Sequence, residues 1–135
     1  MMAGGDKETF SYVEPAIKLM CAENAYALVG EEGGAGHYVK MIHNAVEYGM
    51  MQALAEGLSL IQNKAELGLD PAAVAQMWRH GSVVRSWLLD LTAEALADEG
   101  AVDRVAPVVA DSGEGRWSAI EAVEQGVPAP VISLA

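Results

Sequence analysis

The longest regular pattern in the sequence runs from about residue 37 to residue 66, where apolar residues occupy most positions. At about 100° per residue, its most prominent polar residues fall within a sector of roughly 140° on one side of a helix. A surface helix has the opposite proportions, with a broad polar face and a narrower apolar stripe. We therefore predict a buried helix of about 45 Å, at about 1.5 Å per residue, whose polar stripe faces a cleft. The stripe consists of Lys40, His43, Asn44, Glu47 and Tyr48.

The residues before this helix indicate a strand, a helix and a second strand. Asp6 can cap a helix over residues 7–22, and Pro15 lies in the middle of that helix. An internal proline removes one intrahelical hydrogen bond, so we expect a helix with a local disturbance. Residues 25–29 favour a brief strand, and the glycine-rich loop 30–36 follows it. This segment resembles the edge of an α/β unit.

The residues after the long helix lack strand alternation and favour shorter helices. Gly68 is expected to end the long helix. Asp70 followed by Pro71 predicts the next helix, because it places a capping residue before proline at the first helical position. That helix should stop near Gly81. Ser82 is then predicted to cap a helix up to residue 99, with an apolar face that starts at the two following valines.

The end of the chain combines a polar loop with short helical segments. A loop over residues 111–116 precedes a predicted helix over residues 117–125, and residues 128–135 resemble the first turns of a helix that is cut short. The predicted fold is therefore mainly α, with a long central helix, packed shorter helices and a small β-α-β segment in front of them.

Composition narrows the classes of protein to which the chain can belong. Its 135 residues suit one domain, or one domain and a piece of another, and 52% hydrophobic residues support a sizeable core. A net charge of −11 argues against nucleic acid as a partner, because a phosphate backbone would be repelled. No apolar run approaches the roughly 20 residues of a membrane span. The single cysteine, Cys21, excludes an internal disulfide, so we expect a reducing cytoplasm as the compartment.

The polar stripe and its neighbours resemble the catalytic-helix signature of the 6-phosphogluconate dehydrogenase family. Residues 34–49 carry this resemblance, and the block from Lys40 to Glu47 is its most specific part. Residues 111–117 resemble the family's substrate loop, in the short form of a small and often bacterial branch. With further matches at either end, the resemblance extends over nearly the whole chain.

The resemblance implies a division of the chain and a set of partners. Residues 1–33 would be the incomplete end of a Rossmann-type dinucleotide-binding domain, and residues 34–135 would be a helical substrate and dimerisation domain with a truncated C-terminus. A small anionic sugar acid would be the substrate, and a homodimer is expected through the helical domain. The coenzyme would be NADP or NAD. This chain alone is expected to be inactive, because no Gly-x-Gly-x-x-Gly fingerprint follows a strand in it.

The reaction implied by the resemblance needs two residues that handle protons. The family oxidises the C3 hydroxyl of 6-phosphogluconate by hydride transfer to the coenzyme, loses carbon dioxide and protonates the enol to give ribulose 5-phosphate. By resemblance, Lys40 takes the hydroxyl proton and then polarises the keto group, and Glu47 protonates C1 of the enol. His43 and Asn44 would bind the substrate's carboxylate and hydroxyls, and Tyr48 would reach its phosphate. An apolar surround would favour the neutral amine that a lysine base requires.

Other interpretations stay open. Ser112 and Glu114 stand where many family members have a phosphate-binding lysine and threonine, and Glu114 would repel a phosphate unless it points away or pairs with Arg116. The chain could therefore come from another β-hydroxyacid dehydrogenase that acts on an unphosphorylated acid, or be a catalytically silent helical dimerisation module. His43 and Glu47, at i and i+4, could be a simple helix pair or two metal ligands, but no third ligand lies nearby in sequence. We expect no metal.

Overall fold

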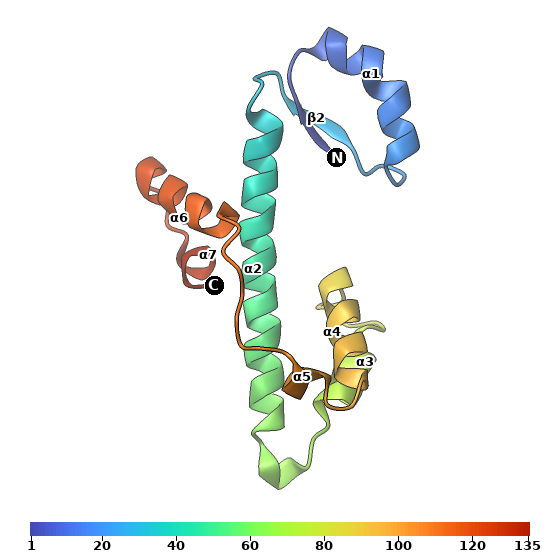
Figure 1. The fold of residues 1–135 in the computed structure, drawn as a ribbon, viewed down its shortest axis with the longest axis vertical. Helices are drawn as coiled ribbons and strands as arrows, with labels where there is room; N and C mark the ends of the chain where they lie inside the picture. The colour runs from blue at the N-terminus through green and yellow to red at the C-terminus, as the bar shows by residue number, and fades with distance from the viewer. The chain divides into compact units, whose positions relative to one another are not determined.

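The computed structural model describes all residues from 1 to 135, and most of them lie in helices (Figure 1). The predicted mainly α fold with one long helix is confirmed. Contacts divide the chain into two units, which are residues 1–47 with 111–134 and residues 48–110 with 135. The long helix α2 (Ala35–Gln62) supplies residues to both units.

The first unit begins with the predicted strand, helix and strand. The strands β1 (Met2–Gly4) and β2 (Ala27–Gly30) pair in parallel, and α1 (Lys7–Met20) connects them. Asp6 caps α1 as expected, because its carboxylate accepts a hydrogen bond of 2.7 Å from the backbone N–H of Thr9. The helix continues through Pro15. The small β-α-β segment is therefore present.

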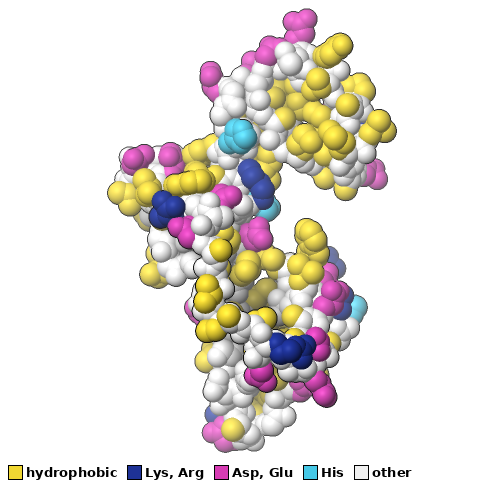
Figure 2. Space-filling model, viewed as in Figure 1, with side chains coloured by type: hydrophobic (Ala, Val, Ile, Leu, Met, Phe, Trp, Pro, Cys, Tyr) yellow, Lys and Arg dark blue, Asp and Glu magenta, His cyan; other side chains and the backbone are white.

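Few side chains of this segment are buried. Ile17 is the buried residue of α1, and the hydroxyl of Tyr26 donates a hydrogen bond of 2.8 Å to Glu14 of the same helix. Apolar side chains lie on the surface of the β-α-β segment (Figure 2), including Leu19, which is 90% exposed. The two strands and α1 are thus joined by a few polar and aromatic contacts rather than by a wide core.

Two glycines bring the start of α2 against β1. A Cβ atom on Gly36 would lie 2.5 Å from the carbonyl oxygen of Met2, and one on Gly4 would lie 2.6 Å from the backbone nitrogen of Gly36. Only residues without a side chain allow this approach. The close contact places the first turns of α2, and therefore Lys40, beside the N-terminal strand.

Helix α6 (Glu114–Gln125) is bonded to α2 at two points within the first unit, and it leads into the short α7 (Pro130–Leu134). The hydroxyl of Ser118, a buried residue, lies 3.4 Å from the carbonyl oxygen of Met41. The side-chain amide of Gln125 donates a hydrogen bond of 2.9 Å to the hydroxyl of Tyr38. These contacts fix the N-terminal turn of α6 next to the part of α2 that carries the polar stripe.

The second unit has its own small core. Leu58 of α2 packs with Ala75 of α3 (Pro71–Trp78) and with Leu89 and Ala93 of α4 (Trp87–Ala97). Asp70 caps α3 as predicted, by accepting a hydrogen bond of 2.9 Å from the N–H of Ala72. Two short elements complete this unit, the 3₁₀ turn η1 (Ala65–Leu67) and α5 (Ala101–Arg104).

The predicted start of α4 was wrong. Ser86 caps the helix, since its hydroxyl accepts a hydrogen bond of 3.1 Å from the N–H of Leu89. Ser82 instead accepts a hydrogen bond of 3.3 Å from the N–H of Val84 and closes a turn that does not continue as a helix. The predicted apolar face was therefore wrong at its start, because Val83 is 99% exposed and Val84 is exposed as well. Two other boundaries also differ, because α2 ends at Gln62 instead of residue 66 and α6 begins at Glu114 instead of residue 117.

Helix α2 is less buried than its apolar sequence predicts. Val46, Met50 and Met51 are each more than 40% exposed, and Lys40 is exposed as well. The reason is that neighbouring elements cover only part of the helix surface, as α6 and β1 do in the first unit. The expectation of a fully buried helix is therefore corrected. No helix in the structure combines the length and the apolar character that a membrane span needs.

Candidate active site

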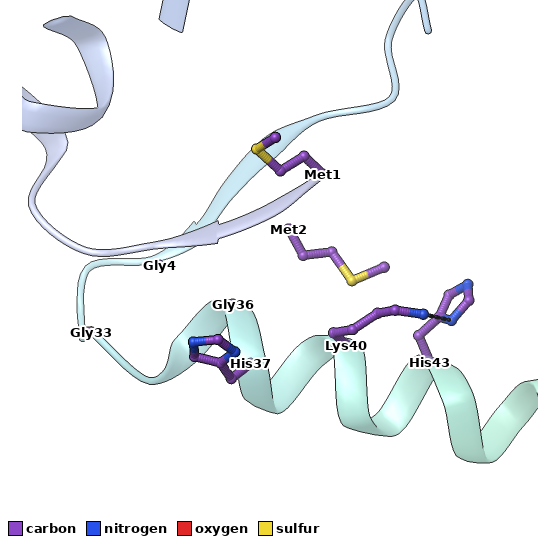
Figure 3. Close-up of a pocket in the computed structure, with 8 residues that line it drawn as sticks. All are labelled: Met1, Met2, Gly4, Gly33, Gly36, His37, Lys40 and His43. Carbon is purple, nitrogen blue, oxygen red and sulfur yellow. Dashed lines mark hydrogen bonds between the residues drawn. The ribbon is translucent and has the colours of Figure 1, made fainter. Parts of the chain in front are cut away.

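The candidate site is built on two consecutive turns of α2. Lys40 donates a hydrogen bond to the side-chain oxygen of Asn44, one helical turn further along. The Nζ atom of Lys40 also lies 3.4 Å from Nδ1 of His43, a contact drawn in Figure 3. Because i+3 and i+4 positions share a helix face, the backbone alone brings these side chains together. The predicted polar stripe therefore forms a connected group.

His43 is the centre of this group. Its Nδ1 atom lies 3.2 Å from Oδ1 of Asn44 and 3.9 Å from Oε2 of Glu47, in addition to the contact with Lys40. A neutral imidazole carries its proton on one of two ring nitrogens. If Nδ1 is unprotonated it can accept a hydrogen bond from Lys40, and if it is protonated it can donate one to Asn44. The Nδ1 atom of His43 can therefore bond either neighbour, according to the tautomer.

A pocket of about 360 Å³ opens beside Lys40 and His43, between α2 and the N-terminal strand. Figure 3 shows the thioether of Met2 extending along one side of this pocket, near the amine of Lys40. One wall therefore carries ionisable groups, and the other carries apolar atoms and exposed backbone. The pocket is lined by Met1, Met2, Gly4, Gly33, Gly36, His37, Lys40 and His43.

Glu114 joins the same site from α6. The hydroxyl of Ser112 donates a hydrogen bond to its carboxylate. This hydroxyl, the backbone N–H of Glu114 itself, the positive charge of Lys40 and the side-chain amide of Asn44 all lower the pKa of Glu114. Asn44, whose oxygen accepts the hydrogen bond of Lys40, is thus the last and smallest of the groups that lower the pKa of Glu114.

Arg116 does not pair with Glu114, which was one of the two possibilities left by the sequence. Its Nε donates a hydrogen bond of 3.0 Å to Oδ2 of Asp111. The other oxygen of Asp111 accepts a hydrogen bond of 2.8 Å from the backbone N–H of Gly113. Arg116 and then this N–H lower the pKa of Asp111. The loop is thus closed upon itself, and the carboxylate of Glu114 accepts its hydrogen bond from Ser112 of the same loop.

Burial differs among the predicted site residues. Lys40 and His43 are exposed, and Asn44 and Glu47 are half-buried. The expectation that an apolar surround would prepare Lys40 as a neutral base is therefore not met within this chain. Tyr48 is the next residue of α2 after Glu47 and is also half-buried.

The residues of this chain do not fit the pyrophosphate of a dinucleotide. Such a group binds at the N-terminus of a helix that follows a parallel strand. After β1 this position is taken by the carboxylate of Asp6, which accepts hydrogen bonds from the backbone N–H and the hydroxyl of Thr9. After β2, the loop before α2 carries Glu31 and Glu32, both exposed. Carboxylates at both positions would repel the phosphates.

Glu114 and the N-terminal strand are the parts of the site that the sequence did not assign. The pocket wall formed by Met1 and Met2 lies far from Lys40 in sequence, and so does Glu114. The strand β1 approaches α2 through the contact of Gly36 with Met2, and α6 approaches it through the contact of Ser118 with Met41. The periodicity of the sequence does not reveal such contacts between distant segments. No group of three or more His, Cys, Asp or Glu side chains is placed to hold a metal ion.

Comparison with known proteins points to one family. A family model described as the C-terminal domain of 6-phosphogluconate dehydrogenase matches residues 36–135. The chain is 42% identical over 133 residues to YqeC of Bacillus subtilis, which is provisionally named a 6-phosphogluconate dehydrogenase. It is 40% identical over 134 residues to a protein of Haloferax volcanii named NAD(+)-dependent, decarboxylating 6-phosphogluconate dehydrogenase. A decarboxylating 6-phosphogluconate dehydrogenase of Lactococcus lactis is 38% identical over 148 aligned positions.

These matches include nearly all of the chain but only a part of each relative. Each alignment uses 98% of this chain, against 44% of the Bacillus and Haloferax proteins and 30% of the Lactococcus protein. The chain therefore spans less than half the length of these relatives.

Proposed function

Because the chain belongs to the 6-phosphogluconate dehydrogenase family, we propose that it supplies the residues for substrate binding and proton transfer in the oxidative decarboxylation of 6-phosphogluconate to ribulose 5-phosphate. The observation that supports this most directly is the contact of Lys40 with both His43 and Asn44. It places an amine and an imidazole on one side of a pocket large enough for a small sugar acid, and the amide of Asn44 is bonded to that amine.

Lys40 would serve first as a base and then as an acid. As a base it would take the proton of the C3 hydroxyl, and as an ammonium group it would polarise the keto group while carbon dioxide leaves. An ammonium group has to pass a proton to another group before it can act as a base. His43, with Nδ1 at 3.4 Å, is placed to receive that proton.

Glu47 would protonate C1 of the enol. It lies two turns beyond Lys40 on the same helix and is half-buried. Its Oε2 atom is 3.9 Å from Nδ1 of His43, so a proton can be replaced through the imidazole. The two proton handlers would therefore be kept at a fixed spacing by a rigid helix.

The remaining predicted residues would bind the substrate. His43 and Asn44 would donate hydrogen bonds to its carboxylate and hydroxyls, and Tyr48 would reach its phosphate. The coenzyme would be NADP or NAD, held by protein outside the residues described. We also propose the division at residues 33 and 34 into the end of a coenzyme domain and a helical domain, and a homodimer formed through the helical domain.

A test that needs no coenzyme follows from microscopic reversibility. If Glu47 gives a proton to C1 of the enol, it should also remove one from C1 of ribulose 5-phosphate while Lys40 polarises the adjacent carbonyl. The chain in D₂O should then exchange the C1 protons of ribulose 5-phosphate, as followed by proton NMR. We expect Lys40→Ala and Glu47→Gln each to slow this exchange by at least about a hundredfold.

Two variants provide the controls for this assay. Lys7→Met removes an exposed lysine of α1 and should leave the exchange rate unchanged. In an enzyme that combines this chain with a coenzyme-binding domain, Lys40→Ala should abolish oxidation, whereas Glu47→Gln should chiefly impair protonation of the enol. Near-normal turnover of the Lys40→Ala enzyme would contradict the assignment.

A second candidate substrate is an unphosphorylated 3-hydroxy acid, and one observation favours it. Arg116 is bonded to Asp111, so the loop presents the carboxylate of Glu114 rather than a cation to the substrate. A phosphate would be repelled there. Isothermal titration of the chain with 6-phosphogluconate and with gluconate distinguishes the two substrates. Tighter binding of 6-phosphogluconate supports the first proposal, and tighter binding of gluconate supports the second.

A further inference from the structure

An apolar pocket of about 360 Å³ lies within the second unit, beside the start of α4. Met50, Leu54 and Gly57 of α2 line one side of it, and Trp78 of α3 and residues 83–86 line the rest. Leu54 and Trp78 also pack against the core of this unit, so these two walls are held in place by the core. The apolar pocket is therefore a feature of the fold of the unit.

One lining residue of the apolar pocket, Arg85, is a cation without a carboxylate partner. The chain has four arginines, and each of the other three is bonded to an aspartate: Arg79 to Asp90, Arg104 to Asp98 and Arg116 to Asp111. Arg85 stays unpaired although acidic residues outnumber basic ones by 19 to 8. An unpaired guanidinium beside apolar side chains can stack on an aromatic ring.

The first residue of α4, Trp87, follows the lining segment 83–86 directly and is exposed. Its exposed fraction is 78%, which leaves most of a large apolar side chain in water. Leu91, one turn further along the same face of α4, is 48% exposed. Exposed apolar side chains that gather at one place mark interaction sites. Helix α4 therefore presents an unpartnered apolar face next to an apolar pocket.

We propose that two copies of the chain associate through this surface, and that Trp87 of each copy inserts into the apolar pocket of the other. This inference rests on the proposed homodimer and names the surface that forms it. The indole and the pocket are adjacent in the chain, so a twofold axis between them lets each copy give one indole and receive one. The guanidinium of Arg85 then stacks on the indole of the partner subunit.

A second copy supplies what each part of this surface lacks. The indole brings apolar atoms to Met50 and Leu54, and its π-face gives Arg85 a partner that needs no negative charge. Association also removes Trp87 and Leu91 from water. Tryptophan and arginine are the residue types whose truncation weakens protein interfaces most often, which agrees with a central role for Trp87 and Arg85.

The proposal is tested first by sedimentation velocity, which measures the dissociation constant of the dimer. We expect Trp87→Ala to raise this constant by at least about thirtyfold, as the truncation of one hot spot does. Arg85→Met keeps the apolar stem and should raise it by about three- to tenfold. The control Leu19→Ala removes a side chain of α1 that is 90% exposed, and it should leave the constant unchanged.

A second variant closes the apolar pocket instead of removing the indole. Gly57 lines the pocket, and a Cβ atom there meets no atom within 4 Å, so the leucine side chain of Gly57→Leu has room to fill the pocket. Gly57→Leu should weaken association as Trp87→Ala does. A mixture of the two variants should associate more tightly than either alone, because the indole of one enters the open pocket of the other. Loss of folding would not produce this recovery, and its absence would contradict the proposed contact.

Fluorine NMR of the chain labelled with fluorotryptophan observes the three tryptophans separately. The resonances of Trp87 and Trp78 should shift as the chain concentration rises, and that of Trp117 should not. A shift of Trp78 upon addition of dodecanoate, with none upon dilution of the chain, would overturn the proposal and assign the pocket to a small amphipathic anion. Unchanged association of both Trp87→Ala and Gly57→Leu would overturn it as well.

This proposal and the proposed function fail in different ways. A chain that stays monomeric at every concentration but exchanges the C1 protons of ribulose 5-phosphate through Lys40 would overturn the interface alone. A dimer that depends on Trp87 and Gly57, without that exchange, would overturn the proton-transfer role of Lys40 and Glu47 alone.

Discussion

The guanidinium of Arg116 and the carboxylate of Asp111 close the loop in front of α6 with a hydrogen bond of 3.0 Å. The same carboxylate accepts a hydrogen bond from the backbone N–H of Gly113, so one side chain fixes the loop at two points. The pairing also determines the charge that the loop offers to α2. With Arg116 engaged, it is not available to neutralise the carboxylate of Glu114, which accepts a hydrogen bond from Ser112.

The stability of the loop in front of α6 should depend on pH, because the carboxylate of Asp111 that holds it can be protonated. Arg116 and the Gly113 N–H lower the pKa of Asp111 in the folded state below its ordinary value. A carboxyl group of this kind contributes stability above the unfolded-state pKa and loses it as the pH falls through the folded-state pKa. We expect the protection factor of the Gly113 amide in hydrogen exchange to be constant from about pH 5 to 7 and to fall below about pH 4. Asp111→Ala should lower protection between about pH 5 and 7 and remove the dependence on pH.

Gly113 should be intolerant of a side chain for two separable reasons. Its φ of 101° disfavours other residues, and a Cβ atom there would lie 2.6 Å from the ring of Trp117. Gly126, which ends the same helix, has a φ of 66° but no atom within 4 Å of such a Cβ. We expect Gly126→Ala to cost roughly 1 kcal/mol and Gly113→Ala to cost roughly 2–3 kcal/mol in urea unfolding followed by circular dichroism. Equal losses in the two variants would contradict a steric role of Trp117.

Local signals in the sequence predicted those elements whose ends are determined by neighbouring residues. Asp6 and Asp70 were assigned as helix caps, and both carboxylates accept the expected backbone hydrogen bonds. Ser82 was assigned for the same reason, but Ser86 also precedes an apolar run and has equal capping ability. The choice between them depends on Leu89 and its place in the core of the second unit, which no local pattern determines.

The two serines provide a direct comparison of a cap with a turn. We expect Ser86→Ala to reduce the stability of α4 by about 1 kcal/mol, because the N–H of Leu89 loses its partner. Ser82→Ala should cost less than about half of that, since its hydroxyl makes a single bond in an exposed turn. Hydrogen exchange of the Leu89 and Val84 amides resolves the two effects. A larger loss of Leu89 protection in Ser82→Ala than in Ser86→Ala would contradict the observed cap.

In the candidate site, too, some contacts follow from the local sequence and others depend on segments far apart in the chain. The contacts of Lys40 with His43 and Asn44 follow from helical spacing, so the sequence predicted that these residues share a face. Helix α6, which begins at Glu114, is held to α2 by the contacts of Ser118 and Gln125, which involve residues far apart in the chain. The exposure of Lys40 also depends on which elements cover α2. Neither property is encoded in a short pattern.

The approach of β1 to α2 can be tested at two glycines of the same helix. Alanine favours a helix more than glycine does, and Gly57 has no atom within 4 Å of an added Cβ, so Gly57→Ala should stabilise the chain by up to about 1 kcal/mol. Gly36→Ala has the same advantage in helix propensity, but its Cβ atom would lie 2.5 Å from the carbonyl oxygen of Met2. Because this distance is too short, the backbone of β1 would have to move. We expect Gly36→Ala to separate β1 from α2 and to widen the pocket beside Lys40. The methyl resonance of Met2 should then shift towards its value in the unfolded chain, whereas it should stay unchanged in Gly57→Ala. A Met2 resonance unaffected by Gly36→Ala would mean that the strand does not depend on this contact, and the pocket wall opposite Lys40 would need another support.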